Sequence, residues 1–255
     1  MGRIARHFYL SCMAFLALSL CSAGPAGALD DQQKKEIGDF IKQYLIENPE
    51  VLLDVQSALE QKQAEEQAKK SSELIGSNRD SIFHSPDDVV LGNPKGSVTI
   101  VEFFDYNCHY CKIALPDMEA IIEKDSDVRF VLKEFPILGP DSIAAHKVAD
   151  AFRLIAPEKY HDFHRALLGG DERATETRAL AVAAKLGVTE AEIQAKMKAS
   201  PFKVRATKVY SLAEKMGING TPAYIIGNET MSGAVGIDLL SSKVSNVRTC
   251  GKTVC

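Results

Sequence analysis

Two cysteines, Cys108 and Cys111, lie three positions apart directly after a run of strand-forming residues, in the stretch VEFFDYNCHYCK. Thiols at this spacing can open and close a disulfide, and they can equally supply half of a zinc site. A zinc site needs a second ligand pair, and the other candidates are Cys250 and Cys255 at the far C-terminus. At a strand–helix junction, unpaired backbone N–H groups stabilise a thiolate on the first cysteine. The pattern therefore favours a redox-active dithiol, with no metal, over a zinc site.

Two charged or titratable neighbours could support such a dithiol. Glu102 shares a strand face with apolar residues, six positions before Cys108, so it is expected to be buried beneath the pair. A buried carboxyl group there could pass a proton to or from Cys111 as the disulfide opens and closes. The alternative is that Glu102 only forms an ion pair, for example with Lys133. His109, when protonated, would further stabilise the Cys108 thiolate.

The elements around the pair predict an α/β fold. Residues 98–105 are apolar on both alternating faces, which is typical of a central strand covered on both sides. A helical stretch and a second strand follow, so the cysteines lie at the helix N-terminus of a βαβ unit. Residues 141–216 predict several consecutive helices, too many for one crossover. The remaining expected elements are an edge strand at 89–91, a hairpin of 223–226 and 229–232, and a last helix at 237–247.

The N-terminus predicts export. Arg3 and Arg6 precede a short apolar run and the small residues ending at Ala28, which is typical of a secretory signal peptide over residues 1–28. A lipoprotein site at Cys21 is disfavoured by the large side chain of Leu20. The mature chain is then expected in the periplasm, an oxidising compartment. A net charge of −4 without a long basic run disfavours nucleic acid as a partner.

The motifs FFDYNCHYCK, LKEFPILGP and GTPAYIIG, in this order, resemble the DsbA-like branch of the thioredoxin superfamily. The resemblance implies a thioredoxin fold with a helical insertion at about 140–216, and no cofactor. It implies that Cys108 is the nucleophile and Cys111 its buried partner, and that Glu102 is the family's buried acid. It also implies a cis bond before Pro222, with Thr221 facing the cysteines.

One departure from the family pattern concerns the dipeptide between the cysteines, His109-Tyr110, where the best-known oxidase has Pro-His. This dipeptide tunes the redox potential in the family, so the sequence does not imply strong oxidising power.

Residues 29–77 are similar to the oligomerisation region of trimeric disulfide isomerases of the suppressor-of-copper-sensitivity (ScsC) type. Two short helices with apolar stripes, from Ile37 and from Val51, precede a polar helical linker that ends near Ser77. Such helices are marginal alone and must bury their stripes against another surface. The resemblance favours a homotrimer; the alternative is packing against the chain's own catalytic domain, predicted at residues 78–255.

These features together predict a periplasmic protein thiol–disulfide oxidoreductase, favoured as an isomerase or reductase of disulfide-containing proteins. A membrane redox partner would reduce or oxidise it. The alternatives are a DsbA-like oxidase, a Cu(I)-binding module that uses Cys108 and Cys111, and a holdase that needs neither thiol.

Two other signals carry less weight. His161 and His164 lie three apart on an expected helix, and we interpret them as part of a solvated face rather than a metal site. Cys250 and Cys255 predict a small structural disulfide; the alternative is a second redox or copper-binding pair.

Overall fold

The computed structural model describes residues 29–200 and 202–255. The predicted signal peptide lies outside the described residues. Contacts within the chain divide it after Lys62 into two units. Among the described residues, no helix combines the length and the apolar character needed to cross a membrane.

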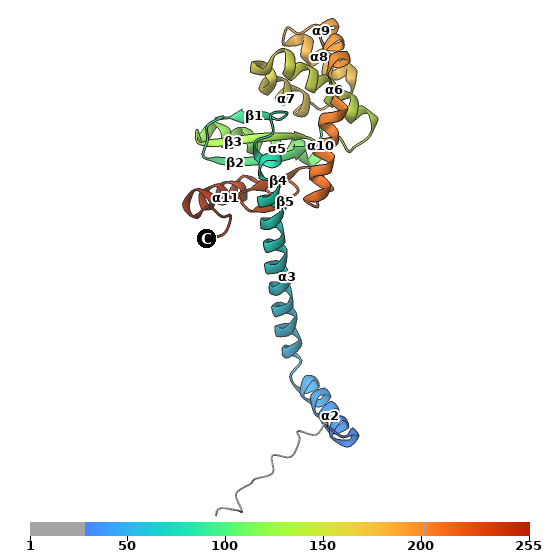
Figure 1. The fold of residues 1–255 in the computed structure, drawn as a ribbon, viewed down its shortest axis with the longest axis vertical. Helices are drawn as coiled ribbons and strands as arrows, with labels where there is room; N and C mark the ends of the chain where they lie inside the picture. The colour runs from blue at the N-terminus through green and yellow to red at the C-terminus, as the bar shows by residue number, and fades with distance from the viewer. Residues whose placement is uncertain (1–28, 201) are drawn as a thin grey trace, which may run out of the picture. The chain divides into compact units, whose positions relative to one another are not determined.

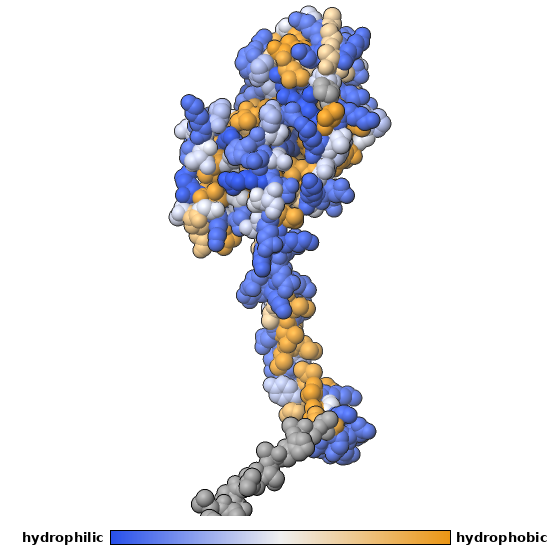
Figure 2. All heavy atoms as spheres, in the orientation of Figure 1, coloured by the Kyte–Doolittle hydropathy of each residue, from blue (hydrophilic) through white to orange (hydrophobic). Residues whose placement is uncertain are grey.

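The first unit holds α2 and the beginning of α3. Helix α2 spans Asp31–Glu47 and begins at a capping box, in which Asp30 and Gln33 satisfy each other's backbone N–H groups. Helix α3 spans Glu50–Ser77 and continues into the second unit. Most of the large apolar side chains of α2 and of the beginning of α3 are exposed, and Figure 2 shows them in orange along both helices. The most exposed of them are Phe40, Ile46 and Leu53.

The second unit is built on a five-stranded sheet with strand order β1-β3-β2-β4-β5 (Figure 1). The strands are β1 (Val89–Gly92), β2 (Val98–Phe104), β3 (Val128–Glu134), β4 (Ala223–Ile226) and β5 (Glu229–Ser232). Strands β2 and β3 are parallel and joined by α5 (His109–Lys124), whereas the other pairs are antiparallel. The predicted βαβ unit, central strand, edge strand and hairpin are therefore confirmed.

The two faces of β2 contact different helices, as its double alternation predicts. Ile100 and Phe104 pack in one core with residues of α5 and α11 (Ile237–Cys250). Val101 and Phe103 pack in a second core with residues of α4 (Arg79–Phe83) and α10 (Phe202–Lys215). Burial on both faces fixes the strand at the centre of the sheet.

The predicted helical insertion is a set of helices between β3 and β4, most of which gather beyond one end of the sheet (Figure 1). Besides α10 they are α6 (Pro140–Ile155), α7 (Tyr160–Leu168), α8 (Glu176–Lys185) and α9 (Glu190–Ala199). Buried residues of α6 and α7, such as Phe152 and Phe163, join the same core as Phe104. The insertion is thereby part of the second unit and not an appendage.

Candidate active site

The two cysteines lie where the chain passes from β2 into α5. Cys108 is the N-cap residue of α5, and Cys111 lies in the first helical turn. Both are free thiols; Cys111 is fully buried and Cys108 is 6% exposed. The N-cap position places the Cys108 sulfur beside backbone N–H groups that have no partner within the helix.

The environment separates the acidities of the two thiols. Hydrogen bonds from the Cys111 thiol, the Thr221 side chain and the backbone N–H groups of Cys111 and Tyr110 lower the pKa of Cys108 to about 6, against the opposing effect of burial. Burial, together with that same bond to Cys108, raises the pKa of Cys111 far above its ordinary value. At neutral pH Cys108 is therefore mostly a thiolate, and Cys111 holds its proton.

A loop distant in sequence contacts Cys108. The Thr221–Pro222 peptide bond is cis, and in the thiol form Cys108 Sγ donates a hydrogen bond to the Thr221 carbonyl oxygen at 3.0 Å. Pro222 comes immediately before β4, which pairs with β2 on the side opposite β3. The Thr221 backbone oxygen therefore lies at the Cys108 thiol.

Glu102 is 3% exposed, and the Tyr224 hydroxyl donates to its Oε1 at 3.4 Å. Burial raises the pKa of Glu102 to about 8. The charge of Glu102 is also one of the causes that raise the pKa of Cys111, so the two groups interact electrostatically. A buried carboxyl group that titrates near neutral pH is suited to proton transfer.

The alternative that Glu102 pairs with Lys133 is wrong. Lys133 lies opposite Phe103 in the parallel register and so faces the other side of the sheet. There it forms a buried ion pair with Asp88 and donates to the Ser81 carbonyl oxygen at 2.6 Å. The alternation of side chains along a strand separates two residues that the sequence alone could pair.

The residues between the cysteines, His109 and Tyr110, are exposed, and their rings lie 5.6 Å apart, centroid to centroid. Tyr110 is 60% exposed. Both side chains therefore lie at the surface beside Cys108.

Two residues of the turn before Cys108, neither of them among the predicted site residues, hold this turn in place. The buried Asp105 carboxylate accepts from the backbone N–H groups of Asn107, Ile137 and Leu138 at 2.8–2.9 Å. The Asn107 side chain bonds both the N–H and the C=O of Ala174, in the insertion. The available signal was an Asx residue directly after a strand, which often caps a turn.

The interpretation of His161 and His164 as a solvated face is wrong for His164. His164 is 1% exposed and packs edge-on against Phe104, with 4.8 Å between the ring centroids. Burial lowers its pKa to about 3, so it is neutral. His161 lies at the surface, where Nε2 contacts Glu119 at 2.7 Å. No group of three or more His, Cys, Asp or Glu side chains within the described ranges is arranged to hold a metal ion.

Two features lie apart from the dithiol. Cys250 and Cys255 are joined by a disulfide at the end of α11.

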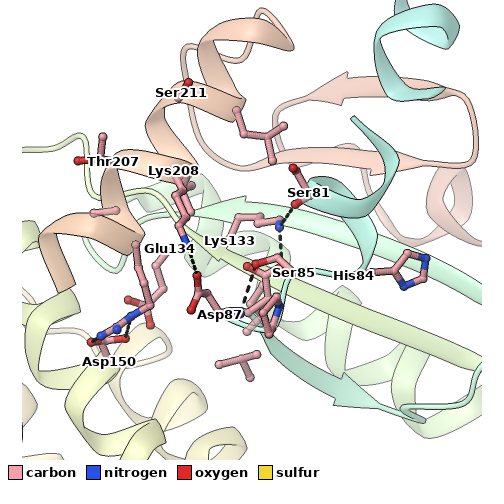
Figure 3. Close-up of a pocket in the computed structure, with 18 of the residues that line it drawn as sticks. Ser81, His84, Ser85, Asp87, Lys133, Glu134, Asp150, Thr207, Lys208 and Ser211 are labelled. Atoms are coloured by element: carbon pink, nitrogen blue, oxygen red, sulfur yellow. Dashed lines mark hydrogen bonds and ion pairs between the residues drawn. The ribbon is translucent and has the colours of Figure 1, made fainter. Parts of the chain in front are cut away.

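A pocket of about 600 Å³ is lined by residues of α4, β1, β3, α6 and α10 (Figure 3). Its polar residues include the pairs Lys133–Asp88 and Lys208–Asp87. None of the predicted site residues lines it.

Comparison with known families finds two matches. The DSBA-like thioredoxin domain matches residues 99–245, and the copper resistance protein ScsC N-terminal domain matches residues 33–66. The second match lies within α2 and α3, the part of the chain whose similarity to ScsC proteins the sequence indicated.

Solved structures with the same fold include three thioredoxin-like proteins. A thioredoxin-like oxidoreductase from Silicibacter pomeroyi is 39% identical, with 68% of this chain and 99% of that chain covered and a TM-score of 0.65. BcfH from Salmonella enterica Typhimurium is 27% identical (82% and 93% covered, TM-score 0.69). ScsC from Proteus mirabilis in a transitional conformation is 26% identical (84% and 94% covered, TM-score 0.56).

Among curated proteins, the chain matches Na(+)/H(+) antiporters NhaA of Salinispora tropica and Salinispora arenicola at 22% and 24% identity. The matches cover 69% and 62% of this chain but only 28% and 24% of those longer proteins.

Proposed function

Because the chain belongs to the DsbA-like thioredoxin family and is a thiol–disulfide oxidoreductase of the DsbA/ScsC type, we propose that it acts in the periplasm as a disulfide isomerase or reductase through Cys108 and Cys111. The observation that carries the proposal is the division of acidity within the pair: a Cys108 thiol with a pKa of about 6 beside a fully buried, protonated Cys111.

The exchange proceeds through a mixed disulfide. The Cys108 thiolate attacks one sulfur of a substrate disulfide, forms an S–S bond with it and releases the other substrate sulfur as a thiolate. In isomerisation, a substrate thiolate then attacks the mixed disulfide and releases Cys108 without net oxidation. In reduction, Cys111 loses its proton and attacks the Cys108 sulfur; the substrate leaves as a dithiol, and the protein is left with the Cys108–Cys111 disulfide. A membrane redox partner would supply the two electrons that restore the dithiol.

Glu102 donates and accepts the proton that Cys111 must regain and lose. When the Cys108–Cys111 disulfide is opened by a reductant, Cys111 leaves as a buried thiolate, and the protonated Glu102 carboxyl can supply its proton. In the opposite direction, the Glu102 carboxylate accepts the proton as Cys111 attacks. A pKa of about 8 leaves both forms populated close to neutral pH, as a group with both tasks requires.

The state of the dithiol in cells tests the direction. Acid quenching, alkylation with a bulky maleimide and a gel shift would report it, in a variant with Cys250→Ser and Cys255→Ser so that the gel shift reports Cys108 and Cys111. A reduced pair is expected for an isomerase or reductase. An oxidised pair would overturn this direction and identify an oxidase.

The first unit is proposed to assemble the protein into a homotrimer. Phe40 and Ile41 of α2 and Leu53 and Leu59 of α3 are 50–68% exposed in the single chain, and association would remove this apolar surface from water. Phe40→Glu should therefore lower the molar mass measured by light scattering, whereas Lys42→Glu, on the same helix, should leave it unchanged. A wild-type protein with the mass of one chain would contradict the trimer.

A Cu(I)-binding module is the second candidate, favoured by the match of residues 33–66 to a domain of a copper resistance protein. Cys108 and Cys111 would be its ligands, since thiolates suit Cu(I). Stoichiometric Cu(I) retained against a competing chelator, in a protein without disulfide exchange activity, would support this candidate over the oxidoreductase. A holdase should prevent aggregation equally well after Cys108→Ser, and the enzyme should lose its activity.

A further inference from the structure

The turn that carries Cys108 is held from the helical insertion by a hydrogen bond to its backbone. The N–H group of Tyr106, two residues before Cys108, donates to Nε2 of His146 on α6 at 3.3 Å. Both residues are completely buried. A buried backbone N–H group without an acceptor is unfavourable. The imidazole nitrogen Nε2 supplies the acceptor that the Tyr106 N–H group requires.

This bond determines the protonation of His146. A nitrogen that accepts a hydrogen bond carries no proton, so His146 is neutral and its proton lies on Nδ1. Nδ1 has no hydrogen-bond partner within the described part of the chain, but it lies 3.3 Å from Oε2 of Glu134. The carboxylate favours a proton on the facing nitrogen and so leaves Nε2 free to accept.

A second branch leads from the Tyr106 hydroxyl to the same carboxylate. The Tyr160 hydroxyl donates to Glu134 Oε1 at 2.9 Å, so it must accept from the Tyr106 hydroxyl, 3.1 Å away. The Tyr106 oxygen in turn can accept from His164 Nδ1 at 3.4 Å. The two branches thus join the backbone and the side chain of Tyr106 to Glu134, which is also one of the residues that line the pocket of Figure 3.

We propose that His146 is a positioning residue for thiol–disulfide exchange, acting through Tyr106 on the turn that sets Cys108 at the helix N-terminus. This inference rests on the proposed function. No hydrogen bond joins His146 to either sulfur; it holds the Tyr106 backbone, and so the turn that sets Cys108 against the N–H groups of Tyr110 and Cys111. The stability of a thiolate at a helix N-terminus depends on that alignment, so releasing the Tyr106 N–H group should make Cys108 less acidic.

Three replacements at His146 separate acceptor geometry from bulk. In His146→Gln, the amide oxygen can reach the place of Nε2 and accept from Tyr106. In His146→Asn, the same amide stops at the place of Nδ1. In His146→Leu, the acceptor is absent. Val148→Ala serves as the control, because it removes buried apolar volume from the same helix without touching the hydrogen bond.

The measurement is the rate of iodoacetamide alkylation of Cys108 against pH, read by mass spectrometry on the reduced full-length protein. His146→Asn and His146→Leu should raise the midpoint by about one pH unit, which slows alkylation below the wild-type midpoint about tenfold. His146→Gln should stay within about twofold of wild type, and Val148→Ala should keep the wild-type midpoint.

Equal midpoints in the Asn, Gln and wild-type proteins would overturn the inference, and so would an equal shift in Val148→Ala. If the Leu variant does not fold, the contrast between Asn and Gln decides. Alkylation needs no protein substrate, so it is independent of the proposed function. That function fails separately if insulin reduction by the wild-type protein is unaffected by Cys108→Ser.

Discussion

Replacing Glu102 by glutamine should stabilise the reduced protein increasingly as pH rises. In the fold, burial raises the pKa of Glu102 from 4.5 to about 8, so the native state keeps a proton that the unfolded chain releases. Below pH 4.5 Glu102 is protonated in both the native and the unfolded state, so its ionisation does not change the free energy of unfolding. As pH rises from 4.5 to 8, the native state becomes progressively less favourable, and above 8 the cost is constant.

The magnitude follows from the two pKa values. One pKa unit corresponds to about 1.36 kcal/mol, so the cost approaches about 5 kcal/mol above pH 8 and is about 3 kcal/mol at pH 7. Glutamine does not titrate and should escape this cost. Its amide can still accept from the Tyr224 hydroxyl, but its buried N–H donors cost about 1–3 kcal/mol at every pH. The change in stability with pH is therefore the diagnostic quantity.

Urea unfolding of the reduced proteins from about pH 5 to about pH 8 provides the assay, followed by far-ultraviolet circular dichroism because the chain has no tryptophan. The lowered pKa of Cys108 changes stability in the opposite direction, but it does so in both proteins, and the difference between them isolates Glu102. Glu123→Gln, at an exposed position of α5, is the matched control and should show no such trend.

A difference between Glu102→Gln and wild type that stays constant over this pH range would refute the reasoning. It would mean that Glu102 is ionised in the native state, and so could not act as a proton donor to Cys111. The predicted outcome also carries a functional cost: the more stable variant should exchange disulfides more slowly, because its amide cannot transfer the proton.

Three further predictions concern the thiol, its turn and the C-terminal disulfide. Alkylation of Cys108 should rise with pH around a midpoint near 6, and a midpoint above about 8 would contradict the stabilised thiolate. Asp105→Ala should lower the free energy of unfolding by about 3 kcal/mol, measured in urea, because three backbone N–H groups lose their acceptor; the exposed control Asp171→Ala should be neutral. Replacing Cys250 and Cys255 by serine should cost about 2 kcal/mol by the loop-entropy relation while the alkylation rate of Cys108 stays unchanged; a slower rate would link this disulfide to the site.

The sequence by itself determined the features that depend on local spacing. Alternation along residues 98–105 indicates a strand buried on both faces, and the helical stretch after Cys111 places the pair at a helix N-terminus. These patterns need no partner from elsewhere in the chain. The burial of Glu102 follows in the same way, from the apolar residues that share its face.

The tertiary structure alone decided which distant groups meet those residues. The Thr221 oxygen reaches Cys108 across 113 positions of sequence. Sheet register places Lys133 on the face opposite Glu102, where it forms an ion pair with Asp88. Packing of α7 buries His164 against Phe104. His146 and Tyr106 meet only because the insertion folds over the end of β2. Periodicity fixes the face on which a side chain lies, but strand order and helix packing select its partner, because those contacts join segments whose separation no local pattern encodes.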